Sequence, residues 1–273
     1  MRRVHITLQG KGGVGKSLIA ALVAQGYLRK GLDVVCVDTD PINATFSGYT
    51  AFATRRVELM EGGIIKRARF DSMMEWLLDE DRNFVIDNGA SSFVPLSSYL
   101  IENDAVSLIG EAGKKVVVHT VITGGQGLLD TLNGFDELAK QLPANADLVV
   151  WLNEYFGPVE LEGKKFDQMA VYERHRRRTY SVLRIGKASE LMNADVELML
   201  TQRLTVDEAV RSPSFRVMQK QRLAMFWKQI ASQLGELMDE TSPHRTDGEQ
   251  AEYGRKKAEA PHWRGGEETS GCP

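Results

Sequence analysis

A glycine-rich segment near the amino terminus constrains the fold of this chain more than any other feature. Residues 10–17 read Gly-Lys-Gly-Gly-Val-Gly-Lys-Ser and match the pattern G-x-x-x-x-G-K-[ST]. A strand-like run at residues 4–8 precedes the segment, and a helical apolar pattern at residues 18–30 follows it. Glycines let backbone N–H groups turn inward around a phosphate, and the positive end of the next helix adds to the attraction. The strand–loop–helix order therefore predicts a phosphate-binding loop.

Short strand patterns alternate with longer helical ones along much of the chain. Further strands are predicted at residues 34–38, 83–87, 116–122 and 148–152, and further helices at residues 128–142 and 215–238. Such alternation is typical of a parallel sheet with crossover helices. We expect an α/β fold of three layers, in which helices flank a mostly parallel sheet. The charged, less periodic stretch at residues 157–186 is predicted to be surface elaboration.

The composition predicts one folded domain followed by a tail. The chain has 273 residues, of which 42% are hydrophobic, and this is enough apolar material to build a core without disulfides. We expect residues 1–238 to form this domain. Residues 239–273 have almost no aliphatic side chains and many Gly, Pro and charged ones. They are predicted to form a disordered polar tail.

Charge and cysteine content exclude several classes of protein. The net charge of −3 gives no global positive field, so any contact with nucleic acid has to come from a local patch. Two cysteines are too few for a disulfide framework or an iron–sulfur cluster. No apolar stretch approaches the ~18 residues of a membrane span, and no signal-peptide pattern follows Met1. We expect a cytoplasmic location.

Residues of the loop and of the strand ends suggest a site for a nucleoside triphosphate. Lys16 is expected to reach the β- and γ-phosphates, and the Ser17 hydroxyl to ligate Mg²⁺. Asp38 ends the second strand, Asp40 follows it, and Asp87 ends the third, at the sheet edge where ligands bind in such folds. Asp87 has the position of a carboxylate that binds Mg²⁺, usually through water. The predicted nucleotide-binding residues in the loop are Gly12, Gly13, Val14, Gly15, Lys16, Ser17 and Leu18.

Lys11 is a second lysine that an ordinary phosphate loop does not need. With it, residues 11–17 resemble the deviant phosphate loop of the ParA/MinD-type ATPases. The resemblance implies that Lys11 crosses a nucleotide-sandwiched dimer and touches the partner's phosphates, like an arginine finger. It also implies that Asp38 lies near the metal with Ser17 and Asp87. Asp40 would orient or activate the attacking water, so that Lys11, Lys16 and Asp40 are the catalytic residues, and Asn153 would read adenine.

Longer segments resemble the TraL family of conjugative transfer proteins, which is related to StbB. The likeness covers roughly residues 3–238, and the run Asp-Asn-Gly-Ala-Ser-Ser at residues 87–92 is its most specific part. It implies an ATPase that uses ATP and Mg²⁺, forms a homodimer when ATP is bound, and serves plasmid transfer or maintenance with other transfer proteins. The expected reaction is slow, partner-stimulated hydrolysis of ATP to ADP and phosphate.

Two other functional classes fit parts of the pattern. A non-hydrolysing adaptor would bind nucleotide only to hold its shape. A metabolic ATP-dependent ligase or reductase shares the expected fold, but the reductase needs cluster-binding cysteines that Cys36 and Cys272 cannot supply. A GTPase is disfavoured because the guanine-reading Asn-Lys-x-Asp is absent after the fifth strand.

Three weaker signals have alternative interpretations. The basic run at residues 173–178 is either a patch for non-specific contact with DNA phosphates or, as we favour, a solvated charged face. His119 lies in a hydrophobic strand and is predicted to be a core histidine. The helix at residues 215–238 is predicted to pack on the core rather than on a membrane, through Met218, Phe226, Ile230 and Leu234.

Overall fold

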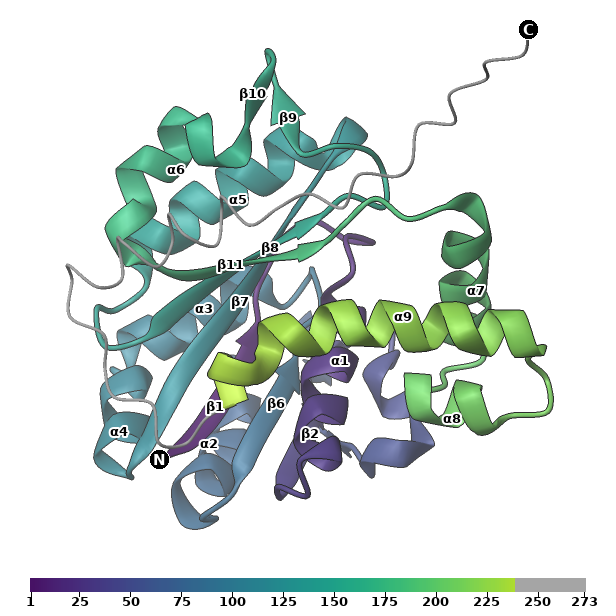
Figure 1. Ribbon diagram of the computed structural model, residues 1–273. Coiled ribbons are helices and arrows are strands. Elements are labelled where there is room, and N and C mark those ends of the chain that lie inside the picture. Colours follow the sequence, from purple (N-terminus) through teal and green to yellow (C-terminus); the bar gives the residue numbers. More distant parts are fainter. Residues whose placement is uncertain (239–273) are drawn as a thin grey trace, which may run out of the picture.

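The centre of the fold is a seven-stranded sheet. The computed structural model describes residues 1–238, and the predicted tail at residues 239–273 lies outside the described residues. The strands are ordered β11-β8-β7-β1-β6-β2-β3, and all the pairings between them are parallel (Figure 1). Their bounds are β1 Arg2–Thr7, β2 Val34–Asp38, β3 Arg55–Arg56, β6 Asn83–Asp87, β7 Lys114–Thr123, β8 Asp147–Asn153 and β11 Thr179–Ile185.

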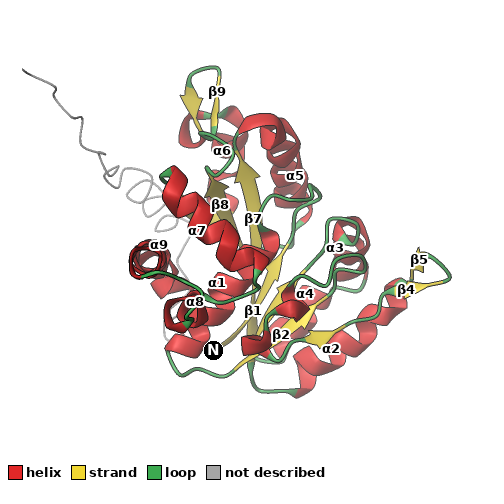
Figure 2. Cartoon of the chain, turned by 90° about the vertical axis from the view of Figure 1, so that its right-hand side faces the viewer, coloured by secondary structure: helices red, strands yellow, loops and turns green. Residues whose placement is uncertain are grey.

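Helices cover both faces of the sheet and complete the three predicted layers (Figure 2). One face carries α1 Lys16–Arg29, α7 Glu190–Thr201, α8 Val206–Arg211 and α9 Val217–Leu234. The other carries α2 Phe70–Asp79, α3 Phe93–Glu102, α4 Ala105–Glu111, α5 Leu128–Gln141 and α6 Ala170–His175. Two short hairpins lie outside the main sheet, β4 Met60–Glu61 with β5 Ile64–Ile65, and β9 Glu160–Leu161 with β10 Lys164–Lys165.

The central strands are buried on both faces, which explains their continuous apolar runs. In β7, Val116 and Val118 pack in one core while Val117 and Val121 pack in the other, as the two-residue period of a strand requires. None of the helices in residues 1–238 combines the length and the apolar character needed to cross a membrane.

Two sequence predictions about the later part of the chain were wrong in part. The stretch at residues 157–186 is not all surface elaboration, because it ends in β11, an edge strand of the main sheet. The polar residues of β11 interrupt the apolar pattern that is typical of a buried strand. Phe226, Ile230 and Leu234 in α9 are buried as predicted, but Met218 is 62% exposed. Met218 lies roughly 140° around the helix from the buried Leu223, since each residue turns an α-helix by about 100°.

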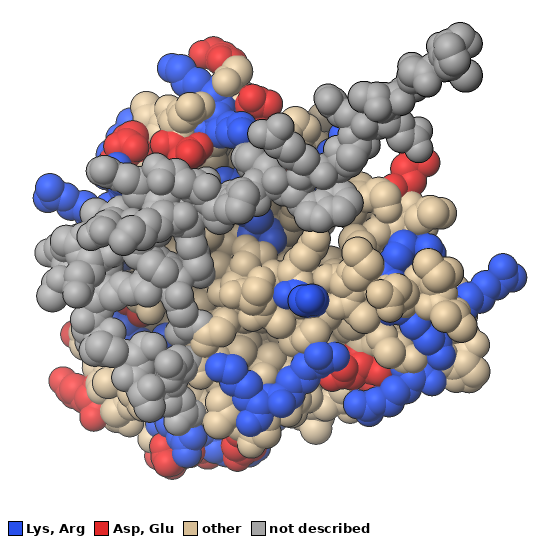
Figure 3. All heavy atoms as spheres, in the orientation of Figure 1, with Lys and Arg blue, Asp and Glu red and all other residues tan. Residues whose placement is uncertain are grey.

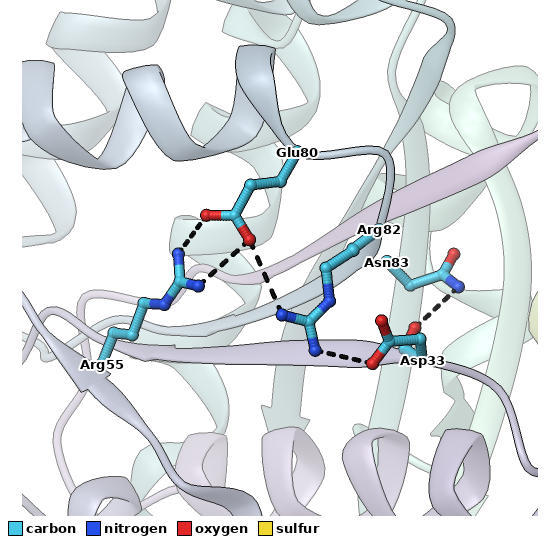
Figure 4. Close-up of polar contacts among 5 residues, drawn as sticks. All are labelled: Asp33, Arg55, Glu80, Arg82 and Asn83. Atoms are coloured by element: carbon cyan, nitrogen blue, oxygen red, sulfur yellow. Dashed lines mark hydrogen bonds and ion pairs between the residues drawn. The ribbon is translucent and has the colours of Figure 1, made fainter.

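An ion-pair network fastens the edge of the sheet at β3 (Figure 4). Glu80, after α2, accepts hydrogen bonds from both terminal nitrogens of Arg55. Arg82 bridges Glu80 to Asp33, with its Nη2 atom 2.6 Å from an Asp33 carboxylate oxygen. The Arg55 hydrogen bond lowers the pKa of Glu80, and the Arg82 hydrogen bond lowers the pKa of Asp33. The network joins the ends of β2, β3 and α2.

A chain of buried polar side chains runs through the core beneath α1. His5 Nε2 lies 2.7 Å from the Tyr27 hydroxyl, and His5 Nδ1 lies 2.8 Å from His119 Nε2. Trp151 Nε1 donates to His119 Nδ1 at 2.9 Å. His119 is fully buried, which confirms the prediction of a core histidine.

Candidate functional site

The predicted phosphate-binding loop leads from β1 into α1 at the carboxyl edge of the sheet. Gly13 and Gly15 have φ angles of 73° and 102°, which are left-handed conformations that glycine adopts without strain. Gly15 is the N-cap of α1, and its position gives the helix no side-chain cap. The first N–H groups of α1 therefore remain available to an anion, as the motif requires.

Lys16 points back into this loop. Its side chain is largely buried, and Nζ donates a hydrogen bond to the Lys11 carbonyl oxygen at 2.9 Å. Burial lowers the pKa of Lys16, while the nearby carboxylates of Asp87 and Asp40 oppose that shift. The ammonium group thus lies among the loop carbonyl and the two predicted catalytic and metal-binding carboxylates.

Asp87 and Ser17, both predicted to hold Mg²⁺, lie together. Thr7 Oγ1 donates to Asp87 Oδ1 at 2.9 Å, and the Ser17 hydroxyl also hydrogen-bonds this carboxylate. Burial raises the pKa of Asp87 to about 7, and the two hydroxyl donors oppose the shift. A buried carboxylate beside a hydroxyl fits a hard cation such as Mg²⁺. No group of three or more His, Cys, Asp or Glu in residues 1–238 is arranged to hold a metal. Phosphate and water oxygens would have to complete the shell, as Mg²⁺ prefers.

Asp38 organises the chain that follows β2. Its Oδ1 accepts from the Asp40 backbone N–H at 3.0 Å, and its Oδ2 accepts from the Ser47 N–H at 2.8 Å. Both oxygens of this buried carboxylate therefore hold residues 40–49, which we call the switch segment. Asp38 stays a predicted neighbour of the metal, and the structure adds this second role to it.

Asp40 begins the switch segment and lines a cavity next to the loop. Its Oδ1 accepts from the backbone N–H groups of Ile42 and Asn43 at 2.9 and 3.1 Å. A Cβ atom placed on Gly89 would lie 2.5 Å from Asp40 Cγ. The glycine after β6 thus allows the carboxylate to approach the end of that strand.

Two adjoining cavities meet at the loop. One of about 550 Å³ lies between the loop, the switch segment and the residues after β6, and its lining is rich in polar groups such as Lys16, Ser17, Asp40 and Asn88. The other, of about 220 Å³, is mainly apolar and is walled by the ends of β8 and β11 and by α7 and α9. Both are lined by Gly13, Gly15, Leu18 and Leu200. The pair offers charged groups suited to phosphates beside an apolar space suited to a base.

Sequence reasoning missed most of the wall of the smaller cavity. Its residues on α7 and α9 are Met192, Asn193, Val196, Glu197, Leu200, Phe226 and Gln229. It also missed Tyr49, which lines the larger cavity from the switch segment. No local motif identifies these residues, because the helices that carry them reach the site only through the tertiary fold.

Asn153 ties the end of β8 to the loop. Its Nδ2 donates to the Val14 carbonyl at 2.9 Å, and its Oδ1 accepts from the Tyr155 N–H at 3.2 Å. An amide has two N–H groups and two acceptor lone pairs, so one of each is left for a base. The predicted adenine reader is therefore also a support of the loop.

The side chain of Lys11 lies on the outer rim, although its backbone carbonyl accepts from Lys16. Its Nζ pairs with Asp130 Oδ2 of α5 at 2.7 Å, and the two side chains are 45% and 58% exposed. An ion pair this exposed is worth at most about 1 kcal/mol. The lysine is consequently held only weakly within its own subunit.

The basic run at residues 173–178 is largely paired within the fold. Arg174 and His175 both contact Asp136 of α5, at 2.8 and 2.6 Å. Lys140, with His175, lowers the pKa of Asp136 to about 2. Arg178 donates to backbone carbonyls of residues 142–144. These contacts support the interpretation of a charged structural face.

Comparison with known proteins agrees with this geometry. Residues 6–211 match the family described as "CobQ/CobB/MinD/ParA nucleotide binding domain". Two proteins of Escherichia coli, each called "Protein TraL", are 48% and 46% identical to the chain over 235 residues, which are 86% of this chain and 98% of each relative. The solved MinD cell division protein of Aquifex aeolicus has a similar fold, with a TM-score of 0.51 and 15% identity over 89% of this chain and 100% of that one. The chain therefore belongs to the CobQ/CobB/MinD/ParA nucleotide-binding family and, within it, groups with the TraL proteins.

Proposed function

We propose that this chain is an ATPase that binds ATP with Mg²⁺, dimerises when ATP is bound, and acts with other transfer proteins in plasmid conjugation or maintenance. We also infer a cytoplasmic location. The observation that carries the proposal is the separation of the two loop lysines. Lys16 lies inside the larger cavity beside Asp87 and Asp40, whereas Lys11 lies on the rim in an exposed pair. The similarity to the TraL proteins supports the proposed biological setting.

Each group has a role within this proposal. The N–H groups of residues 12–18 bind the phosphates, and Lys16 balances their charge. Mg²⁺ held beside Ser17 and Asp87 would supply further positive charge to the phosphates. Asp40 orients or activates the attacking water. Asn153 holds the loop and offers its remaining donor and acceptor to adenine.

The rim of the site favours a second copy of the chain as partner. Exposed apolar side chains follow several strands at this edge, namely Ile42, Val94, Leu129, Tyr155 and Phe156. Large exposed apolar groups around a charged site are typical of a contact surface. Lys11 lies at the same edge, so dimerisation would release it from Asp130 toward the partner's nucleotide.

DNA is a further candidate partner. Residues 209–235 contain no Asp or Glu and carry Arg211, Arg216, Lys220, Arg222 and Lys228, of which Arg222 pairs with Asp195 of α7. In Figure 3, Lys and Arg side chains gather over the lower right of the molecule, where α8 and α9 lie. If DNA binds, this surface is a better candidate than the paired run at residues 173–178.

Three variants test the mechanism by size exclusion and phosphate release with ATP and Mg²⁺. Lys16→Ala should lose ATP binding. Asp40→Ala should bind ATP, hydrolyse it at least tenfold more slowly and accumulate as a dimer. Lys11→Ala should bind ATP but neither dimerise nor hydrolyse it.

Lys140→Ala is the matched control, because Lys140 is also exposed and pairs with an aspartate of α5. It should behave like the natural chain. A monomeric Asp40→Ala, or a Lys11→Ala that dimerises and turns over normally, would refute the switch. ATP binding without turnover in the natural chain, with or without plasmid DNA, would favour the non-hydrolysing adaptor.

A further inference from the structure

Arg203 adopts a backbone conformation that favours glycine. It follows α7 with φ at +52°, and the Leu204 N–H closes the helix end on the Met199 carbonyl at 3.1 Å. This is the helix ending in which the left-handed residue is usually glycine, because a Cβ atom is strained there. A long side chain at such a position points to a role that outweighs the strain.

The side chain of Arg203 lies against the switch segment. A Cβ atom placed on Gly48 would lie 2.2 Å from Arg203 Cδ and 2.3 Å from its Nη1. Gly48 ends the 3₁₀ turn Phe46–Gly48. In the described part of the chain, Arg203 has no carboxylate partner. The recorded contact of its side chain is therefore with this turn, at Gly48.

The turn leads directly to the larger cavity. Thr45 and Tyr49, on either side of the turn, both line that cavity. Tyr49 is buried and its ring packs on Phe46 and Phe52, with ring centroids 6.5 and 5.5 Å away. Burial raises the pKa of Tyr49 to about 12, Asp87 adds to the shift, and Arg203 opposes it. Tyr49 thus lies within the electrostatic reach of both groups.

We infer that Arg203 is a positioning residue that clamps the switch segment against the end of α7. The same helix lines the smaller cavity through Met192, Val196 and Leu200. The clamp therefore connects the wall of the smaller cavity to the switch segment, which carries Asp40. The effect on hydrolysis rests on the proposed function, whereas the clamp itself is a property of the chain without nucleotide.

Hydrogen exchange of the nucleotide-free protein tests the clamp directly. The N–H groups of Ser47, Gly48, Tyr49 and Phe52 are hydrogen-bonded and report on the segment. In Arg203→Gly, the strain is removed together with the side chain. We expect an unchanged or higher melting temperature but roughly three- to tenfold faster exchange at residues 45–52, because the turn loses the packing of one side chain.

Glu162→Gly is the matched control. Glu162 is also left-handed, with φ at 51°, and it lies in the β9–β10 hairpin. This variant should share any gain in melting temperature while leaving exchange at residues 45–52 unchanged. If residues 45–52 exchange in Arg203→Gly at the same rate as in the natural chain, the inference is overturned. So would a lower melting temperature with uniformly faster exchange, because Arg203 would then only support the fold.

Gly48→Ala gives an independent test, because its methyl group takes the space of the Arg203 side chain. Alone it should accelerate exchange as Arg203→Gly does. Combined with Arg203→Gly it should add nothing, and an additive effect would overturn the contact. In ATP turnover, Arg203→Gly should lower kcat severalfold at unchanged KM, and a change in KM alone would contradict the link to Asp40. If the natural chain hydrolyses no ATP, the proposed function fails while the exchange results still decide the clamp.

Discussion

The buried histidine pair should make stability depend on pH in a direction that the structure determines. Trp151 Nε1 can only donate, so His119 Nδ1 accepts and His119 carries its proton on Nε2. That proton goes to His5 Nδ1, and the His5 Nε2–H goes to the Tyr27 hydroxyl. Both rings are therefore neutral. Burial lowers the pKa of His119 to about 3, and burial, with His119 and Arg3, lowers that of His5 well below its usual value.

The sign follows from proton binding. The unfolded histidines bind protons below about pH 6.5 and the folded ones do not, so acid favours unfolding. Each histidine lowers the free energy of unfolding by about 1.4 kcal/mol at pH 5.5, and the pair by about 3 kcal/mol. Asp87 acts in the opposite sense. Its folded pKa of about 7 lies above the unfolded value. Protonation of the folded carboxylate therefore raises the free energy of unfolding by about 2 kcal/mol at pH 5.5.

Urea unfolding at pH 8 and pH 5.5, without Mg²⁺ or nucleotide, measures these terms. On acidification the free energy of unfolding of the natural chain should fall by only about 1 kcal/mol, because the opposing effects cancel in part. The free energy of unfolding of Asp87→Asn should fall by about 3 kcal/mol, since only the two histidines still contribute to its pH dependence. Adding His119→Gln to that variant should halve the loss. An Asp87→Asn protein of equal stability at both pH values would refute the neutral histidine chain.

Four further outcomes follow from the site. Asn153→Ala should weaken ATP binding roughly tenfold in calorimetry, because one support of the loop is lost. Gly89→Ala should slow phosphate release at least severalfold while ATP affinity is kept, since the new methyl group displaces the Asp40 carboxylate. Glu197→Gln should narrow the preference for ATP over GTP in competition binding. The Glu197 carboxylate lines the smaller cavity, where it can accept a hydrogen bond from the adenine amino group but repels the guanine oxygen. A chain ending at residue 238 should melt within a few degrees of the full chain, because residues 239–273 have almost no aliphatic side chains to add to a core.

Local signals explain how much of the fold was predictable. The strands at residues 34–38 and 83–87 have the predicted bounds, because strands buried on both faces are continuous apolar runs. β11 was not predicted, because an edge strand tolerates polar residues. Its Thr179, Ser181 and Arg184 interrupt the apolar run. Helices α2, α3 and α4 are short, and α7 and α8 have no strand between them to set their limits, so their patterns are weak.

The candidate site was predictable only on its phosphate side. The loop at residues 10–17 is a contiguous motif, and parallel strand ends bring Asp40 and Asp87 to it by topology alone. The base side depends on where α7 and α9 pack, and periodicity reports only which helix face is buried. Arg203 shows the same limit, because its contact with Gly48 joins residues 155 positions apart that no pattern connects.

Residue type at an expected position does not by itself determine the role, because each polar atom can make only a few bonds. Both oxygens of Asp38 already accept backbone N–H groups of the switch segment. A direct metal bond from Asp38 would therefore compete with the contacts that hold Asp40 in place. Asp87 instead accepts hydrogen bonds from side-chain hydroxyl groups, which can rotate away when a metal binds. We therefore expect cation affinity to depend more on Asp87 and hydrolysis more on Asp38, and titrating Mg²⁺ against Asp38→Asn and Asp87→Asn separates the two. Equal losses of Mg²⁺ affinity in both variants would contradict this division.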